Sequence, residues 1–126
     1  MSFRTDLQRA RGLGTAKDGT QHWVSQRLTA IALIPLTLAF LYPFVQLLGA
    51  SGLAVHETYQ NPVHALIAIG FFYTTFRHLR LGLQVVIEDY VSSRRARAAL
   101  LITNALLMRA LAVIAVFAVA KIAFSS

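Results

Sequence analysis

The chain has 126 residues, of which 56% are hydrophobic and only 13% are charged, and its mean hydropathy is +0.59. A soluble domain of this length needs more polar surface to cover its core, so the composition excludes that class and predicts an all-α integral membrane protein. The absence of cysteine excludes disulfides and iron–sulfur ligation within this chain, and the net charge of +7 raises the question of where the basic residues lie.

Residues 1–26 are polar and contain no apolar run long enough for a signal peptide. We interpret them as a cytoplasmic N-terminal arm that precedes a transmembrane domain over residues 27–126. The first span is expected over about residues 28–50, where Pro35 and Pro43 predict kinks.

Two further spans are expected along the rest of the chain. A short loop over residues 51–61 precedes the second span, over about 63–90, and a second loop over 92–96 precedes the third span, over about 98–120. The second apolar segment approaches thirty residues, or ~45 Å of helix, so it must tilt or project from a hydrocarbon layer of ~30 Å. Three spans of ~20 residues leave no room for a separate catalytic domain.

The basic residues outside the spans are distributed unevenly. Five precede the first span, none lies in the first loop, three lie around the second loop and one follows the third span. The positive-inside rule therefore places the N-terminus and the second loop in the cytoplasm and the C-terminus outside. We attribute the positive charge to this topology rather than to nucleic-acid binding. The residues counted are Arg4, Arg9, Arg11, Lys17, Arg27, Arg94, Arg95, Arg97 and Lys121.

One face of the second span carries polar residues that lipid does not favour. At ~100° per residue His78, Gly82, Val85 and Asp89 share this face of the helix. A glycine one turn from a histidine removes side-chain bulk where a flat group such as a porphyrin could lie.

Two interpretations fit His78. A lone membrane histidine often forms a hydrogen bond to a neighbouring helix, and it can also be an axial haem ligand. Six-coordinate haem needs a second ligand on the opposite face of the ring, but His64 lies ~21 Å away along the same helix, His56 lies in the outer loop and His22 lies at the cytoplasmic edge. A haem site would therefore require another subunit.

A polar stripe lies beside this face, and it contains Arg77, Arg80, Gln84 and Glu88. The arginines could pair with carboxylates, including haem propionates, or extend to the cytoplasmic headgroups. Arg109, midway along the third span, has no acidic residue at its depth, so it requires a partner subunit or a bent helix.

Asp89 and Tyr90 lie ~16 to 18 Å from His78 along the helix, at the cytoplasmic boundary. In one interpretation Tyr90 belongs to the interfacial aromatic belt and the acids pair with Arg94 and Arg95. In the other, the phenol donates a hydrogen bond to a quinone carbonyl and the carboxylate orients it or passes protons.

The stretch HLRLGLQVVIEDYV resembles the second helix of the small hydrophobic membrane anchor subunit of succinate dehydrogenase, the succinate:quinone oxidoreductase of respiratory complex II. The family pattern is His, three residues, Gly, six residues and Asp-Tyr, and residues 78–90 match it without a gap. The stretch HWVSQRLTAIAL, residues 22–33, also resembles the entrance of that family's first helix.

This resemblance implies a multi-pass protein of the bacterial inner membrane that packs with a sister cytochrome b anchor subunit, an iron–sulfur subunit and a flavoprotein subunit. FAD and the iron–sulfur clusters belong to those partners, whereas haem b lies between the two anchors and ubiquinone is the substrate. Carried over, His78 is an axial ligand of the haem iron, Arg27 and His22 lie near the haem propionates and the quinone site, and Gly82 gives clearance for the ring. Tyr90 donates to ubiquinone, and Asp89 supports Tyr90.

Two alternatives remain open from the sequence. A fumarate reductase anchor would share these features, because that enzyme runs the reaction in reverse. A small structural or transporter subunit without a cofactor would use His78 and the arginine stripe for a polar path or a helix contact.

Overall fold

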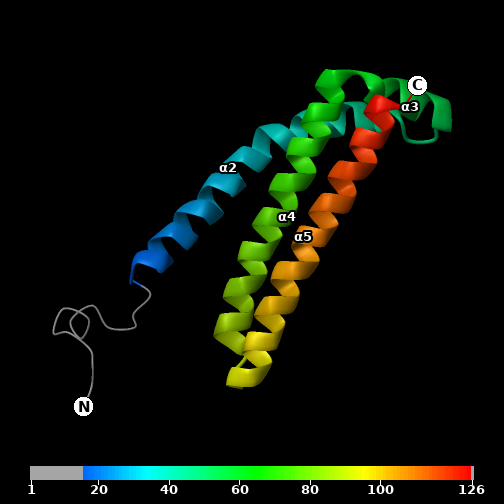
Figure 1. Ribbon diagram of the computed structural model, residues 1–126. Helices are drawn as coiled ribbons and strands as arrows, with labels where there is room; N and C mark the ends of the chain where they lie inside the picture. The colour runs from blue at the N-terminus through cyan, green and yellow to red at the C-terminus, as the bar shows by residue number, and fades with distance from the viewer. Residues whose placement is uncertain (1–15, 126) are drawn as a thin grey trace, which may run out of the picture.

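The computed structural model describes residues 16–125, so the arginines at positions 4, 9 and 11 lie outside the described residues. Four helices make up this part: α2 (Ala16–Gln46), α3 (Gly52–Gln60), α4 (Pro62–Tyr90) and α5 (Arg94–Phe124). Figure 1 shows α3 and the C-terminal end of α5 at one end of the molecule, and the turn between α4 and α5 at the other end. The all-helical prediction is confirmed for the described residues.

The helices are longer than the predicted spans. Helix α2 begins at Ala16, twelve residues before the expected start of the first span, so the last part of the predicted arm is helical. Helix α5 begins at Arg94, which shortens the second loop to residues 91–93. Pro35 and Pro43 both lie inside α2.

The prediction of a simple loop over residues 51–61 was wrong, because Gly52–Gln60 forms the nine-residue helix α3. Ser51 caps this helix by accepting a hydrogen bond from the main-chain nitrogen of Ala54 at 3.4 Å. Asn61 then begins α4 in the same way, since its side chain accepts from Val63 N at 2.9 Å, and Pro62 fits the first helical turn because its missing N–H would have no partner there.

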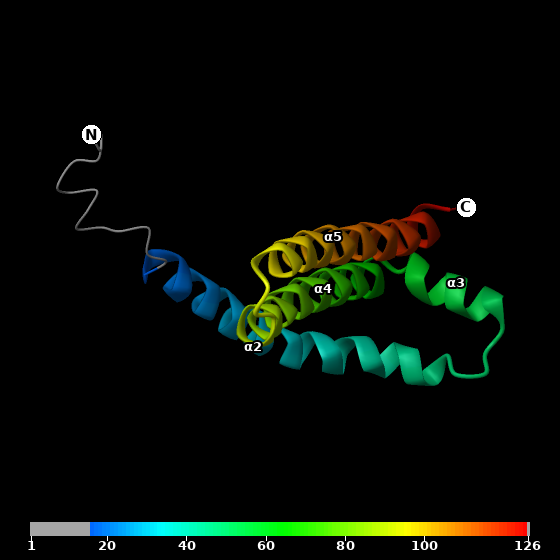
Figure 2. The same ribbon diagram turned by 90° about the horizontal axis from the view of Figure 1, so that it is seen from below.

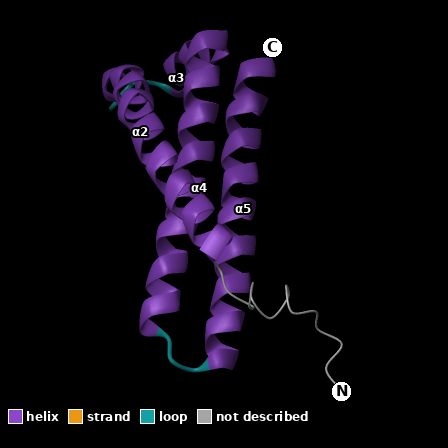
Figure 3. Ribbon diagram, turned by 90° about the vertical axis from the view of Figure 1, so that its left-hand side faces the viewer, coloured by secondary structure: helices purple, strands orange, loops and turns teal. Residues whose placement is uncertain are grey.

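Helix α4 is the central element. It packs along α5 on one side and against α2 on the other, while α3 contacts the ends of α4 and α5. In Figures 1 and 2, α4 and α5 run side by side and α2 diverges from them toward its N-terminal end. Figure 3 shows the same crossing from another side, with short loops joining the helices. Residues of α4 therefore form two different interfaces.

Few apolar residues are buried in this arrangement. Phe40, Ala68 and Val119 belong to a small core at the α3 end, where the Phe40 ring stacks on Phe71 with centroids 4.4 Å apart. Most large apolar side chains of α2 and α5 point outward. Outward-facing apolar surface of this extent is typical of a membrane-embedded or partner-covered protein.

Among the described residues two segments are long and apolar enough to cross a membrane, namely Gly19–Gln46 and Arg94–Phe124. Both are mostly exposed, unlike the core helix of a soluble protein. Helix α4 has 29 residues but falls short of the same apolarity, because its middle carries Arg77, His78 and Arg80.

Candidate functional site

His78 lies against α2 and not in open space. Its Nδ1 atom lies 2.9 Å from Oγ1 of Thr29, a residue 49 positions earlier in the chain. Thr29 is only 8% exposed. The hydrogen bond predicted for a lone membrane histidine is therefore present, and its partner is on the first long helix.

The Thr29 hydroxyl also contacts its own helix. Its oxygen lies 2.9 Å from the carbonyl oxygen of Ser25 and 3.0 Å from that of Gln26, in the back-bonding geometry of threonine within helices. A hydroxyl has one hydrogen and two lone pairs, and a carbonyl can only accept. All three contacts are hydrogen bonds when the hydroxyl donates to the carbonyls and its oxygen accepts from Nδ1–H of His78.

In the neutral imidazole this assignment places the lone pair on Nε2 of His78. No hydrogen bond of Nε2 to another described residue is present. A neutral imidazole whose Nδ1–H is donated and whose Nε2 carries a lone pair is the form that binds a metal. Within residues 16–125 no group of three or more His, Cys, Asp or Glu gathers around a common point, so His78 can offer a single ligand.

Gly82 lies one turn from His78 on the same interface. A Cβ atom at this position would lie 3.5 Å from Nε2 of Gln26, so the space beside Gly82 is bordered by α2 of the same chain. The nearest group to Gly82 is thus an amide side chain of α2, and the clearance for a flat ring stays a prediction.

Two polar atoms at this end of α2 are buried without a hydrogen-bond partner. They are Nε2 of His22 and Oε1 of Gln26, which lie one turn apart on the helix face that also carries Thr29. Buried polar atoms normally have partners, because an unpaired one costs about 1–3 kcal/mol. This face is therefore suited to a polar ligand or a partner subunit.

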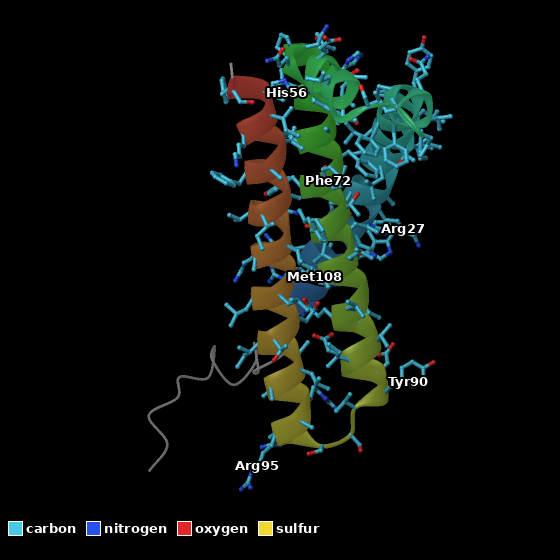
Figure 4. All side chains as sticks on the ribbon, turned by 90° about the vertical axis from the view of Figure 1, so that its right-hand side faces the viewer. Arg27, His56, Phe72, Tyr90, Arg95 and Met108 are labelled. Atoms are coloured by element: carbon cyan, nitrogen blue, oxygen red, sulfur yellow. The ribbon has the colours of Figure 1, made fainter. Side chains whose placement is uncertain are left out.

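The sequence-predicted residues do not all meet. Thr29 contacts His78 and Gln26 contacts Gly82, so α2 and α4 run antiparallel. His22 therefore lies ~10 Å from the level of His78 along the helix axis, toward the Tyr90 end of α4. Arg27 is exposed, and its guanidinium lies 5.6 Å from the Trp23 ring. Figure 4 shows Arg27 on the α2 side of the molecule.

Tyr90 and Asp89 end α4 at the turn to α5. Tyr90 is 84% exposed, and in Figure 4 it projects from this end of the molecule, away from α5. Asp89 is also exposed. No described residue forms a hydrogen bond or ion pair with either side chain, and the predicted pairing with Arg94 and Arg95 is absent from residues 16–125. The phenol and the carboxylate are therefore accessible to a ligand or a partner.

Arg109 borders the same cavity as two arginines of α4. Arg77, Arg80 and Arg109 line one cavity of about 200 Å³ between α4 and α5, together with Tyr73 and Met108. Glu88 accepts a hydrogen bond from Gln84 at 2.9 Å and lies ~12 Å along the helix from Arg80. Arg109 thus joins the arginine stripe of α4, which spacing along one helix cannot reveal.

Sequence reasoning missed Thr29, Gln26 and Asn104. Thr29 and Gln26 lie within the stretch HWVSQRLTAIAL that was singled out, and their spacing from His22 places all three on one helix face. Asn104, which is 7% exposed on α5, had a simpler signal, because a lone amide in the middle of an apolar helix normally has an interhelical partner.

Comparison with known proteins identifies the family of this chain. The family described as succinate dehydrogenase/fumarate reductase transmembrane subunit matches residues 1–120. The chain is similar to the succinate dehydrogenase hydrophobic membrane anchor subunits of Rickettsia bellii, at 34% identity over 100 residues (79% of this chain and 80% of that protein), and Paracoccus denitrificans, at 31% over 101 residues (80% and 78%). It is also 31% identical over 100 residues to the succinate dehydrogenase membrane anchor subunit of Reclinomonas americana (77% and 80%).

No solved structure matches this chain. The family match covers nearly the whole sequence, and the relatives align over about four-fifths of their own length. The chain belongs to the family of succinate dehydrogenase/fumarate reductase transmembrane subunits.

Proposed function

We propose that this chain is a membrane anchor subunit of a succinate dehydrogenase complex, in which it provides one axial ligand of haem b and part of a ubiquinone-reduction site. The names of its relatives support the anchor role. The observation that carries the haem assignment is the hydrogen bond from His78 to Thr29, which leaves the second ring nitrogen free to bind iron.

In this proposal α2, α4 and α5 all cross the bacterial inner membrane. The N-terminus and the α4–α5 turn lie on the cytoplasmic side, as the basic residues of that turn indicate, and α3 lies outside. Helix α4 carries arginines in its middle, so it crosses within a bundle completed by the sister cytochrome b subunit. That subunit supplies the second haem ligand, and the iron–sulfur and flavoprotein subunits bind at the cytoplasmic face.

The haem-side residues are His78, Gly82, His22 and Arg27. His78 would hold the iron through Nε2, while the missing side chain of Gly82 lets Gln26 of α2 lie close to α4. Arg27 and His22 lie toward the cytoplasmic end of His78, where a guanidinium and an unpartnered ring nitrogen suit propionate oxygens or a quinone.

Tyr90 and Asp89 form the quinone side of the proposal. The Tyr90 hydroxyl donates a hydrogen bond to a quinone carbonyl, and Asp89 orients the phenol or passes a proton at the cytoplasmic surface. When bound, haem b and ubiquinone supply the one-electron and two-electron redox chemistry. The chain contributes ligation, hydrogen bonds and a protected position within electron-transfer distance of the iron–sulfur subunit.

A tag on this chain tests the proposal. The purified assembly should contain flavin, iron–sulfur clusters and b-type haem, and it should catalyse succinate-driven quinone reduction. His78→Ala should abolish the reduced-minus-oxidised haem spectrum. His64→Ala is the matched control, since His64 lies on the same helix and its one hydrogen bond within residues 16–125 is to the Thr58 carbonyl oxygen, at 3.2 Å. An assembly that contains flavin and iron–sulfur clusters but no b-type haem, or an intact haem spectrum in His78→Ala, would contradict the haem assignment and favour a subunit without a cofactor.

Tyr90→Phe tests the quinone role separately. It should lower succinate:quinone activity by roughly 10²-fold or more, in line with the typical contribution of a positioned proton donor, while leaving haem content and succinate oxidation by artificial acceptors unchanged. Tyr42→Phe is the control, because Tyr42 is equally phenolic and 69% exposed. Normal quinone turnover in Tyr90→Phe would return Tyr90 to an interfacial role.

A fumarate reductase anchor is the second candidate, because the family description names both enzymes. The relatives described above are all named as succinate dehydrogenase subunits, which favours succinate oxidation. The ratio of succinate:quinone to quinol:fumarate activity of the purified assembly separates the two.

A further inference from the structure

We propose that Thr29 is a positioning residue for His78: by accepting the Nδ1 hydrogen bond it fixes the tautomer and the ring orientation of the imidazole, and thereby sets the properties of the iron bound at Nε2. This inference rests on the proposed haem ligation by His78 and deepens it.

The geometry of Thr29 makes it an acceptor toward His78. Its one hydroxyl hydrogen has two carbonyl oxygens of its own helix within reach, those of Ser25 at 2.9 Å and Gln26 at 3.0 Å. The remaining contact of the hydroxyl oxygen, also 2.9 Å, is to the imidazole Nδ1. Because carbonyls cannot donate, all three contacts are hydrogen bonds only when the imidazole supplies the proton of that last one.

Thr29 is also held rigidly. It is 8% exposed, and a β-branched side chain in a helix has few accessible rotamers. One helical turn away, the contact between Gly82 and Gln26 holds α2 against α4, so the Thr29 hydroxyl and the His78 ring stay within hydrogen-bond distance. The ring plane of His78 is therefore set by α2, a different element from the helix that carries the histidine.

The neutral hydroxyl of Thr29 predicts the effect of this hydrogen bond on the iron. A hydrogen bond donated by Nδ1, the ring nitrogen that does not bind the iron, makes the imidazole a more basic ligand, and this favours the more positively charged ferric state. A hydroxyl is neutral, so it polarises the ring less than a carboxylate does. Removing the hydroxyl should weaken haem binding, raise the haem reduction potential and allow the ring to rotate.

Thr29→Val in the tagged, assembled complex is the direct test, since valine keeps the shape of threonine and removes the hydroxyl. We expect flavin and iron–sulfur content to stay at the wild-type level, and haem retention against a competing haem-binding protein to fall about tenfold, the lower end of the range for outer-shell partners. The haem midpoint potential should rise, and the electron paramagnetic resonance g values of the low-spin haem should shift.

Thr29→Ser keeps the hydroxyl and should restore all three measurements. Thr37→Val is the matched control, because Thr37 lies on the same helix and no described residue forms a hydrogen bond with its side chain. If Thr29→Val prevents assembly, Thr29→Ala and Thr29→Ser carry the same comparison, since only serine retains the acceptor.

The outcomes separate this inference from the proposed function. Wild-type haem properties in Thr29→Val, with haem still lost in His78→Ala, would overturn the role of Thr29 alone. A wild-type complex without haem, or with haem that survives His78→Ala, would overturn the proposed ligation itself. Restoration by serine, but not by alanine, supports the positioning role.

Discussion

Asn104 of α5 donates a hydrogen bond from its side-chain amide to the main-chain carbonyl oxygen of Arg80 on α4, over 2.9 Å. The amide is 7% exposed, and its Oδ1 atom has no hydrogen-bond partner. This bond joins α4 and α5, the most extensively packed pair of helices among the described residues, at the level of Arg80.

Asn104→Ala should therefore loosen the α4–α5 pair. Interhelical side-chain hydrogen bonds in membranes contribute about 1 kcal/mol, because the polar groups also find partners when the helices separate. Hydrogen–deuterium exchange in the middle of α4 and α5 should become about fivefold faster, which corresponds to that free energy. Thr103→Ala, at an exposed neighbouring position, is the control and should leave exchange unchanged. Equal exchange in the two variants would show that the bond contributes nothing.

The sequence predicts much of this fold because long apolar runs determine where long helices lie. Pro62, expected just before the second span, is the first residue of α4, whereas Arg94 and Arg95, expected in the second loop, are the first residues of α5. Helix α3 was missed because nine residues between two spans resemble a loop. Ser51 is its N-terminal cap, and Tyr59 is its buried residue. The length of α2 was underestimated because polar residues are not excluded from a helix that extends beyond the apolar layer.

The site was predictable only to the level of one helix. Periodicity placed His78 and Gly82 on one face, but it could not show that this face packs against Thr29 and Gln26. The same limit applies to Arg109, whose cavity depends on the register between α4 and α5. Contacts between helices depend on crossing angle and register, which a single sequence does not encode in any short pattern.

Gly82 should tolerate one methyl group and nothing larger. A Cβ atom there would lie 3.5 Å from Gln26 Nε2, an ordinary van der Waals distance, and alanine favours a helix by about 1 kcal/mol over glycine. Gly82→Ala should therefore keep the packing of α2 on α4, as should the control Gly70→Ala, whose Cβ would lie 3.5 Å from Leu36 Cδ2.

Gly82→Leu should instead push α2 away from α4 and break the Thr29–His78 contact. The expected result is faster hydrogen exchange around residues 22–29 and, in the assembled complex, an altered haem spectrum. If Gly82→Ala already removes the haem while exchange in α2 stays normal, Gly82 borders the haem itself and not only α2.

Ser125 holds helix α3 against the end of α5. Its hydroxyl lies 2.7 Å from His56 Nε2, and its carbonyl oxygen accepts from Gln60 Nε2 at 2.8 Å. Ser125→Ala removes the first contact and keeps the second, so α3 should lose about 1 kcal/mol of local stability and exchange about fivefold faster. Ser92→Ala, at the opposite end of the molecule, should leave α3 unchanged. No change of exchange in Ser125→Ala would mean that the Gln60 contact is sufficient.

Tyr59 gives α3 a pH dependence in the alkaline range. The residue is buried in the small core at this end, and desolvation raises the pKa of its phenol above the usual value of about 10. The folded state therefore holds the phenol proton more tightly than the unfolded state does. The stability from the neutral phenol is complete below pH ~10 and is lost as the pH rises through the pKa of the folded state.

Tyr59→Phe should remove this dependence, because phenylalanine keeps the packing and cannot ionise. The thermal unfolding temperature of the wild-type complex should fall more steeply above pH ~10 than that of Tyr59→Phe, while the two should respond to pH alike between pH ~7 and ~9. Tyr42→Phe, at an exposed position, should follow the wild-type curve. Parallel curves for wild type and Tyr59→Phe across the alkaline range would show that the phenol ionises without unfolding α3, since burial at this position would then impose no cost on the phenolate.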